Sequence, residues 1–197
     1  MEVAVLIFDG FDELDAIGPY EVLANAAQLG ADLRVQLLTL KPADEVIGSH
    51  GLRVRPDGLL EGRIDLVIVP GGGWNDRAER GVWDEARQGE LPKAAAQLYD
   101  AGATIASVRT GAMLLSAAGL TRGRPATTHH GALDELREQG ADVIEARVVD
   151  DGDLLAAGGV TSGIDLALWL VEREWGAELA KKIEAEMEYE RRDSVHR

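Results

Sequence analysis

The sequence contains no cysteine among its 197 residues. This absence excludes disulfide bonds, thiolate metal sites and every mechanism that depends on a cysteine nucleophile. Lysine is also scarce, with four residues in the whole chain. No apolar run approaches the roughly 18 residues that a membrane-spanning helix requires, so we expect no membrane partner.

Negative charge dominates what is present. The formal net charge is −15, from 35 acidic and 20 basic residues. Such a surface repels nucleic acid, which we therefore do not expect as a partner. An excess of acidic residues over lysine is typical of halophilic proteins, in which salt screens the self-repulsion. The alternative is an ordinary acidic cytoplasmic protein. The N-terminus, MEVAVLIFDG, predicts a first strand rather than a signal peptide.

Short apolar strands alternate with amphipathic helices along the chain. Strands are predicted at 3–8, 33–40, 64–69 and 104–108, and a hairpin is predicted at 46–54 with its turn at Ser49-His50-Gly51. The hydrophobic content of 46% is sufficient for a substantial core. The alternation predicts a single α/β domain over residues 1–197, with a mostly parallel sheet.

Proline sets two of the predicted helix boundaries. Pro19 suits the first turn of a helix, which places Asp15 just before that helix and near the end of the first strand. Asp15 is then either a capping carboxylate or a functional side chain at the carboxyl edge of the sheet. Pro92 marks the start of a second helix.

Two later strands are predicted at 143–149 and 154–156, and a last helix at 177–190.

The stretch TIASVRTGAMLLSAAG, residues 104–119, passes from strand to helix within about one residue. This pattern predicts a nucleophile elbow, a tight corner beside the free amide groups of a helix N-terminus. Developing negative charge is stabilised at such a corner. A thiol or hydroxyl is the expected corner residue, but the chain has Arg109 there.

A glycine loop, VPGGGW at 69–74, follows a strand that is buried on both faces. Its glycines allow backbone amides to approach a ligand; the alternative is a flexible turn. Neither a P-loop lysine nor dinucleotide-binding spacing follows, so we expect no cofactor. His129 and His130, with Asp134, are interpreted as a structural group rather than a metal site, and we expect no metal.

Five segments together resemble the ThiJ/PfpI superfamily, and within it the isonitrile hydratase-like branch. They are FDGFDELDAIGPYEVL, VPGGGW, SVRTGAMLLSAAGL, TRGRPATTHH and GGVTSGIDLALWLVE. The resemblance covers residues 3–189. It implies a flavodoxin-like three-layer α/β sandwich, shared with class I glutamine amidotransferases, and a homodimer.

The resemblance also implies roles for particular residues. Members of the superfamily carry a reactive cysteine at the position of Arg109. The acidic residue near that cysteine corresponds to Asp15, and the threonine after it to Thr110. The remaining implied positions are the oxyanion donors and two further site residues, namely Gly72, Gly73, His129 and Tyr189.

Replacement of the cysteine leaves three hypotheses. In the first, the site is degenerate: Arg109 pairs with Asp15, and thiol-type turnover is absent because a guanidinium is neither nucleophile nor base. In the second, Arg109 and the nearby amides bind a small carboxylate or phosphate. In the third, the protein is a cysteine-independent hydratase or glyoxalase-like lyase, with Asp15 or His129 as general base.

Overall fold

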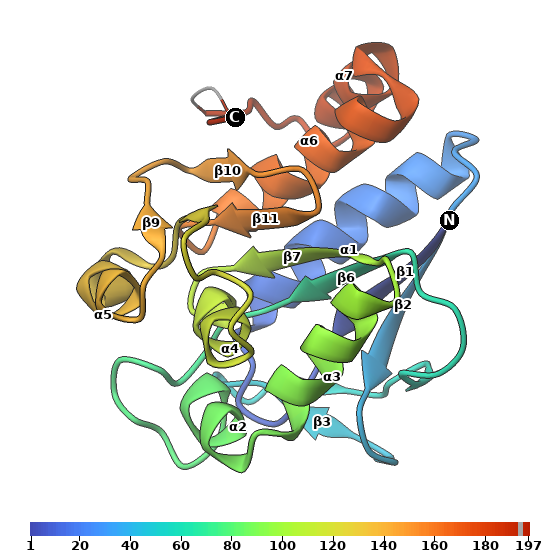
Figure 1. The fold of residues 1–197 in the computed structure, drawn as a ribbon. Coiled ribbons are helices and arrows are strands. Elements are labelled where there is room, and N and C mark those ends of the chain that lie inside the picture. Colours follow the sequence, from blue (N-terminus) through green and yellow to red (C-terminus); the bar gives the residue numbers. More distant parts are fainter. Residues whose placement is uncertain (193–194) are drawn as a thin grey trace.

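A seven-stranded sheet forms the middle of the molecule (Figure 1). The computed structural model describes residues 1–192 and 195–197. The strand order is β10-β11-β7-β6-β1-β2-β5, and every neighbouring pair is parallel except β10 with β11. In chain order the strands are β1 (Glu2–Leu6), β2 (Arg34–Thr39), β5 (Gly58–Leu59), β6 (Leu66–Val69), β7 (Thr104–Val108), β10 (Val148–Asp150) and β11 (Leu154–Ala157).

Helices cover both faces of this sheet (Figure 1). One face carries α1 (Glu13–Gln28), α6 (Ser162–Trp175) and α7 (Ala177–Glu186). The other carries α2 (Val82–Gln88), α3 (Glu90–Asp100) and α4 (Gly111–Ala117). The prediction of a three-layer sandwich with a mostly parallel sheet is confirmed. Among the described helices, none is both long and apolar enough to cross a membrane.

Smaller elements surround the sheet. Strands β3 (Val46–Ile47) and β4 (Arg53–Val54) form the predicted antiparallel hairpin. Strands β8 (Pro125–Ala126) and β9 (Asp142–Val143) pair in parallel. Between them lie a 3₁₀ turn (His130–Ala132) and helix α5 (Leu133–Glu138).

The central strands are buried on both faces, as expected for a covered parallel sheet. All residues of β6 are buried, and Ala106 and Val108 of β7 are fully inaccessible. Helices α1 and α6 pack closely behind these strands because glycine faces the contact from each side. A Cβ on Gly18 would lie 3.1 Å from Ile164 Cγ1, and one on Gly163 would lie 3.2 Å from Pro19 Cγ.

The predicted start of the first helix was wrong. Helix α1 begins at Glu13, so Asp15 lies in its first turn and Pro19 lies inside it. The Asp15 N–H already donates to the Asp12 carbonyl, at 3.1 Å. Packing of the buried face of α1 against α6 therefore outweighs the local preference of proline for a helix start.

Other boundaries differ by a few residues. Helix α3 begins at Glu90, which places Pro92 in its first turn, where the missing N–H has no partner in any case. Val143 belongs to β9, and the strand predicted at 143–149 begins only at Val148. Helix α7 ends at Glu186, short of the predicted residue 190.

Candidate functional site

The elbow predicted between residues 104 and 119 is present. Strand β7 ends at Val108, α4 begins at Gly111, and Arg109 between them has φ of 53°. A non-glycine residue in left-handed backbone is strained and needs support from its surroundings. The Arg109 N–H donates to the Ala157 carbonyl at 2.8 Å, and the Thr128 hydroxyl donates to the Arg109 carbonyl at 2.8 Å. Strand β11 and the turn that contains Thr128 therefore support the strained backbone at Arg109.

Two glycines allow the elbow to pack closely against the glycine loop. A Cβ on Gly111 would lie 2.1 Å from the Val69 carbonyl oxygen, and one on Gly71 would lie 2.7 Å from Thr110 Oγ1. Neither distance is tolerable for a real side chain. The short strand-to-helix corner therefore depends on glycine at both positions.

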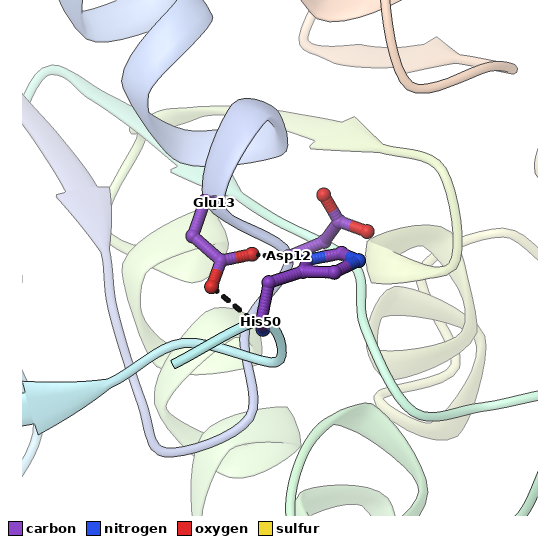
Figure 2. Close-up of side chains that lie close together, drawn as sticks. All are labelled: Asp12, Glu13 and His50. Carbon is purple, nitrogen blue, oxygen red and sulfur yellow. Dashed lines mark hydrogen bonds and ion pairs between the residues drawn. The ribbon is translucent and has the colours of Figure 1, made fainter. Parts of the chain in front are cut away.

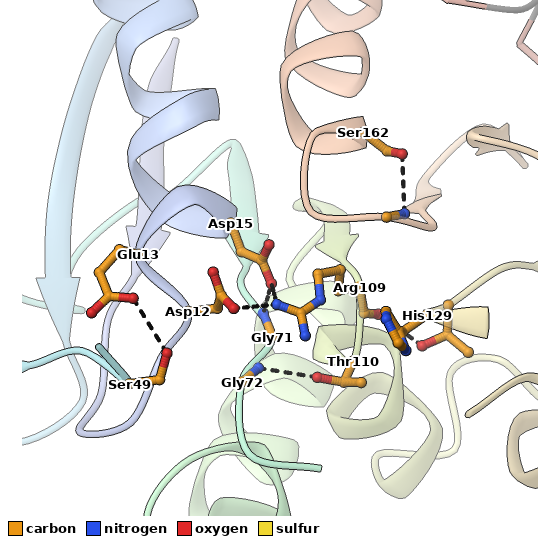
Figure 3. A network of polar contacts seen from close by, with 12 residues as sticks. Asp12, Glu13, Asp15, Ser49, Gly71, Gly72, Arg109, Thr110, His129 and Ser162 are labelled. Atoms are coloured by element: carbon orange, nitrogen blue, oxygen red, sulfur yellow. Dashed lines mark hydrogen bonds and ion pairs between the residues drawn. The ribbon is translucent and has the colours of Figure 1, made fainter. Parts of the chain in front are cut away.

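One end of the Arg109 guanidinium faces two carboxyl groups (Figure 3). Its Nη1 donates to Asp12 Oδ2 and lies 3.5 Å from Asp15 Oδ2. The side chains of Arg109 and Asp12 are each 13% exposed, whereas that of Asp15 is wholly buried. The predicted approach of Arg109 to Asp15 is present, but the hydrogen-bonded partner is Asp12, which sequence reasoning missed. The available signal was the spacing of acids in FDGFDELD, which offers Arg109 more than one carboxylate.

Asp15 is an incompletely satisfied carboxyl group. Its Oδ2 accepts the Gly71 N–H at 3.1 Å, whereas its Oδ1 is buried with no hydrogen-bond partner in the described part of the chain. Arg109 Nε is buried and unpartnered in the same sense. Burial raises the pKa of Asp15 to about 8, although the charge of Arg109 acts to lower it. Asp15 is therefore mostly protonated at neutral pH.

The glycine loop lies beside the elbow, and one of its backbone amides is already hydrogen-bonded within the protein. The Gly72 N–H donates to Thr110 Oγ1 at 3.0 Å, and Thr110 is only 1% exposed. The Gly73 carbonyl accepts the Ala78 N–H at 3.1 Å, and Gly73 has φ of 69°. The Gly72 amide, expected to face a ligand, is thus already bound to the threonine hydroxyl.

His129 lies near the elbow with one ring nitrogen engaged (Figure 3). Its Nδ1 accepts the Gly131 N–H at 3.1 Å and lies 3.1 Å from Asn75 Nδ2. Burial and the charges of His130 and Arg109 lower the pKa of His129. The imidazole is therefore neutral at neutral pH, and with Nδ1 acting as acceptor its proton is on Nε2.

Tyr189 is engaged elsewhere. Its hydroxyl donates to Asp165 Oδ2 at 3.1 Å, beside Arg147, which binds the same oxygen. The structure thus brings Asp15, Arg109, Thr110, Gly72 and His129 together around the elbow, and it ties Tyr189 to the first turn of α6 instead.

A second polar group lies at the start of α1 (Figure 2). Ligand atoms of Asp12, Glu13 and His50 lie within 4.8 Å of one another, the arrangement a metal ion needs. However, Glu13 Oε1 accepts the His50 N–H at 2.7 Å, and its Oε2 lies 2.6 Å from His50 Nδ1 and accepts the Ser49 hydroxyl at 3.2 Å. Burial acts to raise the pKa of Glu13, but hydrogen bonds from the His50 side chain and from backbone N–H groups lower it to about 2.

Glu13 therefore ties the tip of the β3–β4 hairpin to α1, with both oxygens engaged. His50, predicted as a plain turn residue, contributes to this tie. The arrangement is explained as a structural contact without a metal.

Comparison with known proteins agrees with this geometry. The model of the DJ-1/PfpI family matches residues 1–173. The chain belongs to the DJ-1/PfpI family. An isonitrile hydratase from Pseudomonas putida is 36% identical over 192 residues, which cover 96% of this chain and 78% of that protein. A deglycase from Pyrococcus abyssi is 29% identical, covering 80% of this chain and 89% of the relative.

Solved structures of the DJ-1/PfpI family have the same fold. The crystal structure of a ThiJ/PfpI family protein from Pseudomonas syringae superposes with a TM-score of 0.85 at 28% identity, covering 98% of this chain and 76% of that one. Together with the 36% identity to an isonitrile hydratase, this is consistent with the isonitrile hydratase-like branch of the family.

Proposed function

We propose that this DJ-1/PfpI-family protein has lost thiol chemistry at the elbow and uses the elbow as a binding site for a small anion such as a carboxylate. The observation that carries the proposal is the position of the Arg109 guanidinium, at the strained corner and against the carboxyl groups of Asp12 and Asp15. A guanidinium stays protonated and cannot act as nucleophile or base. With no cysteine in the chain, thioester and thiohemiacetal formation have no starting group.

The guanidinium has donors left for a ligand. Asp12 accepts from Nη1, and among the described residues Nη2 makes no hydrogen bond. A planar acceptor such as a carboxylate or phosphate can bind the remaining edge. Because Asp15 is mostly protonated at neutral pH, Asp12 is the main counter-charge to Arg109.

A second donor supports the same ligand class. Neutral His129 has its proton on Nε2, since Nδ1 accepts the Gly131 N–H. Asp15 is wholly buried, so it adds no donor that a ligand can reach. Donors from Arg109 and His129 favour a ligand rich in acceptors and disfavour a cation.

Ligand-dependent stabilisation tests the proposal. Thermal unfolding is measured with formate, acetate and phosphate at constant ionic strength, in the wild type, Arg109→Gln and Arg122→Gln. Arg122 is exposed, so this control loses the same charge away from the elbow. A ligand at 100 times its Kd adds about 2.7 kcal/mol, or roughly 5–10 °C in a domain of this size. We expect the shift in the wild type and the control only; no shift in the wild type, or an equal shift in Arg109→Gln, refutes anion binding.

Arg109→Cys tests whether the rest of the elbow remains competent. If only the nucleophile has been lost, the new thiol should confer hydration of isocyanides or conversion of methylglyoxal, and adding Asp15→Asn should abolish it. A folded Arg109→Cys variant with no thiol reactivity and neither activity contradicts the view that the site is intact apart from Arg109.

A second candidate function is a cysteine-independent hydratase or glyoxalase-like lyase. It is favoured by one observation: the pKa of Asp15, raised by burial to about 8, lets this group exchange protons near neutral pH. His129 is the alternative base, and it is less buried than Asp15. Turnover of isocyanides or methylglyoxal by the wild type, lost in Asp15→Asn or His129→Gln, supports this function. Absence of turnover, or turnover unaffected by both variants, rejects it.

We also propose that the protein is a cytoplasmic homodimer. The resemblance to dimeric members of the family supports the assembly. Light scattering at assay concentration should give twice the chain mass of 21.1 kDa, and a monomer contradicts the assembly. Fractionation of cells that produce the full protein tests the location.

A further inference from the structure

A separate cavity of about 190 Å³ opens at the carboxyl ends of strands β1 and β2. It is enclosed by the β3–β4 hairpin on one side and by helices α2 and α3 on the other, and Figure 1 shows β3 beside these two helices. Asp12, Asp15 and Arg109 are not among the residues that line it. In open α/β sheets, ligands bind at this edge of the sheet.

The cavity has an apolar inner wall. Phe8 is 7% exposed, Val46 3% and Leu91 4%, and all three belong to the hydrophobic core. Half-buried Leu40 and buried Ile7 complete the wall. A wall of this kind favours a ligand with a hydrocarbon or aryl group and gives a hydrated inorganic ion no contact to replace its water.

The opening of the cavity is negatively charged. Its charged lining consists of four acidic residues and one lysine, namely Asp9, Glu45, Glu85, Glu90 and Lys41. Lys41 pairs with Glu90, and Glu45 accepts a hydrogen bond from Arg53 at 2.5 Å. These pairs leave two carboxylates without a cationic partner among the described residues, those of Asp9 and Glu85.

Of these two carboxylates, that of Glu85 makes the fewer interactions. It is half-buried, and within the described chain no hydrogen bond or ion pair reaches its carboxylate. Burial and the charge of Asp84 raise the pKa of Glu85; Glu90 and Asp9 act in the same direction, and Lys41 opposes them. A half-buried carboxylate in a negative field is stabilised by a cation that enters beside it. Asp9 is committed at one oxygen, where Oδ1 accepts the Ile47 N–H at 2.9 Å.

We propose that this cavity binds a small organic cation, a primary ammonium carrying an apolar or aryl group. The ammonium pairs with Glu85 and the second oxygen of Asp9, while the apolar group lies against Phe8, Leu40 and Leu91. Its three N–H donors match carboxylate acceptors, and the excess of acidic groups at the opening excludes anions. This site and the elbow therefore select ligands of opposite charge.

Calorimetry on the full chain at fixed ionic strength, with four matched probes, tests the proposal. These probes are 2-phenylethylammonium, neutral 2-phenylethanol, anionic 3-phenylpropionate and methylammonium. We expect the aryl ammonium to bind about tenfold or more tightly than the alcohol, since hydrogen bonds to charged groups contribute that much. Methylammonium should bind more weakly because it leaves the apolar wall uncovered. Equal binding of the ammonium and the alcohol refutes the cation site, and this comparison needs no variant.

Two substitutions locate the binding. Glu85→Gln should weaken 2-phenylethylammonium about tenfold, whereas Glu138→Gln, which removes the same charge from exposed α5, should change it less than twofold. Leu40→Ala should reduce the preference for 2-phenylethylammonium over methylammonium. Amide NMR shifts should move at Phe8 and Leu40 and not at Thr110. Equal effects of Glu85→Gln and Glu138→Gln, or shifts confined to Thr110, overturn the proposal.

Discussion

Two buried aspartate–arginine pairs in this protein differ in how completely they are satisfied. Asp15 lies near Arg109 at the elbow, and Asp165 binds Arg147 beneath the C-terminal segment. Both aspartates lie in the first turn of a long helix, α1 or α6, and are 0% and 3% exposed. Sequence and burial alone do not separate the two pairs.

Hydrogen bonding does separate them. Asp165 accepts from Arg147 Nε at 3.0 Å, from the Tyr189 hydroxyl at 3.1 Å and from the Arg192 N–H at 3.1 Å. Asp15 accepts only the Gly71 N–H at 3.1 Å, and its Oδ1 has no partner among the described residues.

A buried polar group is normally satisfied, and an exception calls for a reason. Asp165 has the satisfied arrangement of a group that holds α6 to the C-terminal segment. Asp15 and Arg109 Nε retain unused bonding capacity at a strained corner, and Arg109 Nη2 keeps donors that a ligand can use. Under the proposed function, the Asp165 pair serves stability and the Asp15 pair serves binding.

Removal of each arginine should give a large contrast at a single pH. Arg147→Met leaves buried Asp165 without its cationic partner, and should lower the free energy of unfolding by about 3–5 kcal/mol. Arg109→Met should cost only about 1 kcal/mol, because Asp15 is already mostly protonated and Asp12 lies at the N-terminus of α1. Urea unfolding of both variants measures the difference. Equal losses contradict the division between a stabilising pair and a binding pair.

The pH dependence of Asp15→Asn sharpens the comparison. The folded-state pKa of Asp15, about 8, lies above its ordinary value of 3.8, so the folded protein binds an extra proton between these pH values. Wild-type stability from this group is therefore greatest below pH 4 and decreases until pH 8. Asparagine does not titrate, so the variant should gain stability relative to wild type across this window, by about 1.4 kcal/mol for each tenfold difference in acidity. Urea unfolding between pH 4 and 9 measures it, and a constant difference contradicts the raised pKa.

Tyr189→Phe should have a smaller effect, confined to stability. The substitution removes one hydrogen bond to Asp165, which keeps its bonds to Arg147 and the Arg192 N–H, so we expect a loss of about 1 kcal/mol. Anion affinity at the elbow should be unchanged. A loss of affinity with unchanged stability would restore the substrate-binding role that the family resemblance implied for Tyr189.

Much of the fold was predictable because its signals are local. Buried strands read as continuous apolar runs, as at 64–69 and 104–108, and the elbow followed from a strand that meets a helix at Arg109. The start of α1 was not predictable from Pro19, because packing against α6 carries the helix across the proline. Strand β9 was missed as a separate element, since a two-residue strand depends on its partner β8 and not on a periodic pattern.

Several residues of the candidate site were predictable, but their hydrogen-bond partners were not. Family resemblance identified Asp15, Thr110 and His129, and these side chains do lie around the elbow. Asp12 was missed because four acids in FDGFDELD lie within seven residues, and only coordinates show which of them Arg109 Nη1 reaches. The Gly72 amide was misjudged for a similar reason: spacing does not reveal that Thr110 Oγ1 already accepts its proton.

Added salt should have the smallest effect on stability. It distinguishes the contribution of exposed charges from that of the two buried pairs. With a net charge of −15, exposed carboxylates repel one another, and raising KCl from 0.1 to 1 M shortens the screening distance from about 10 Å to about 3 Å. The wild-type melting temperature should therefore rise by a few degrees, as expected for a halophilic composition. Arg109 and Arg147 lie mostly out of water, at 13% and 19% exposure, so the stability gap between Arg109→Met and Arg147→Met should stay constant in the same titration. A gap that closes with salt would show that solvent screens one of these pairs, and a falling melting temperature would contradict the halophilic interpretation.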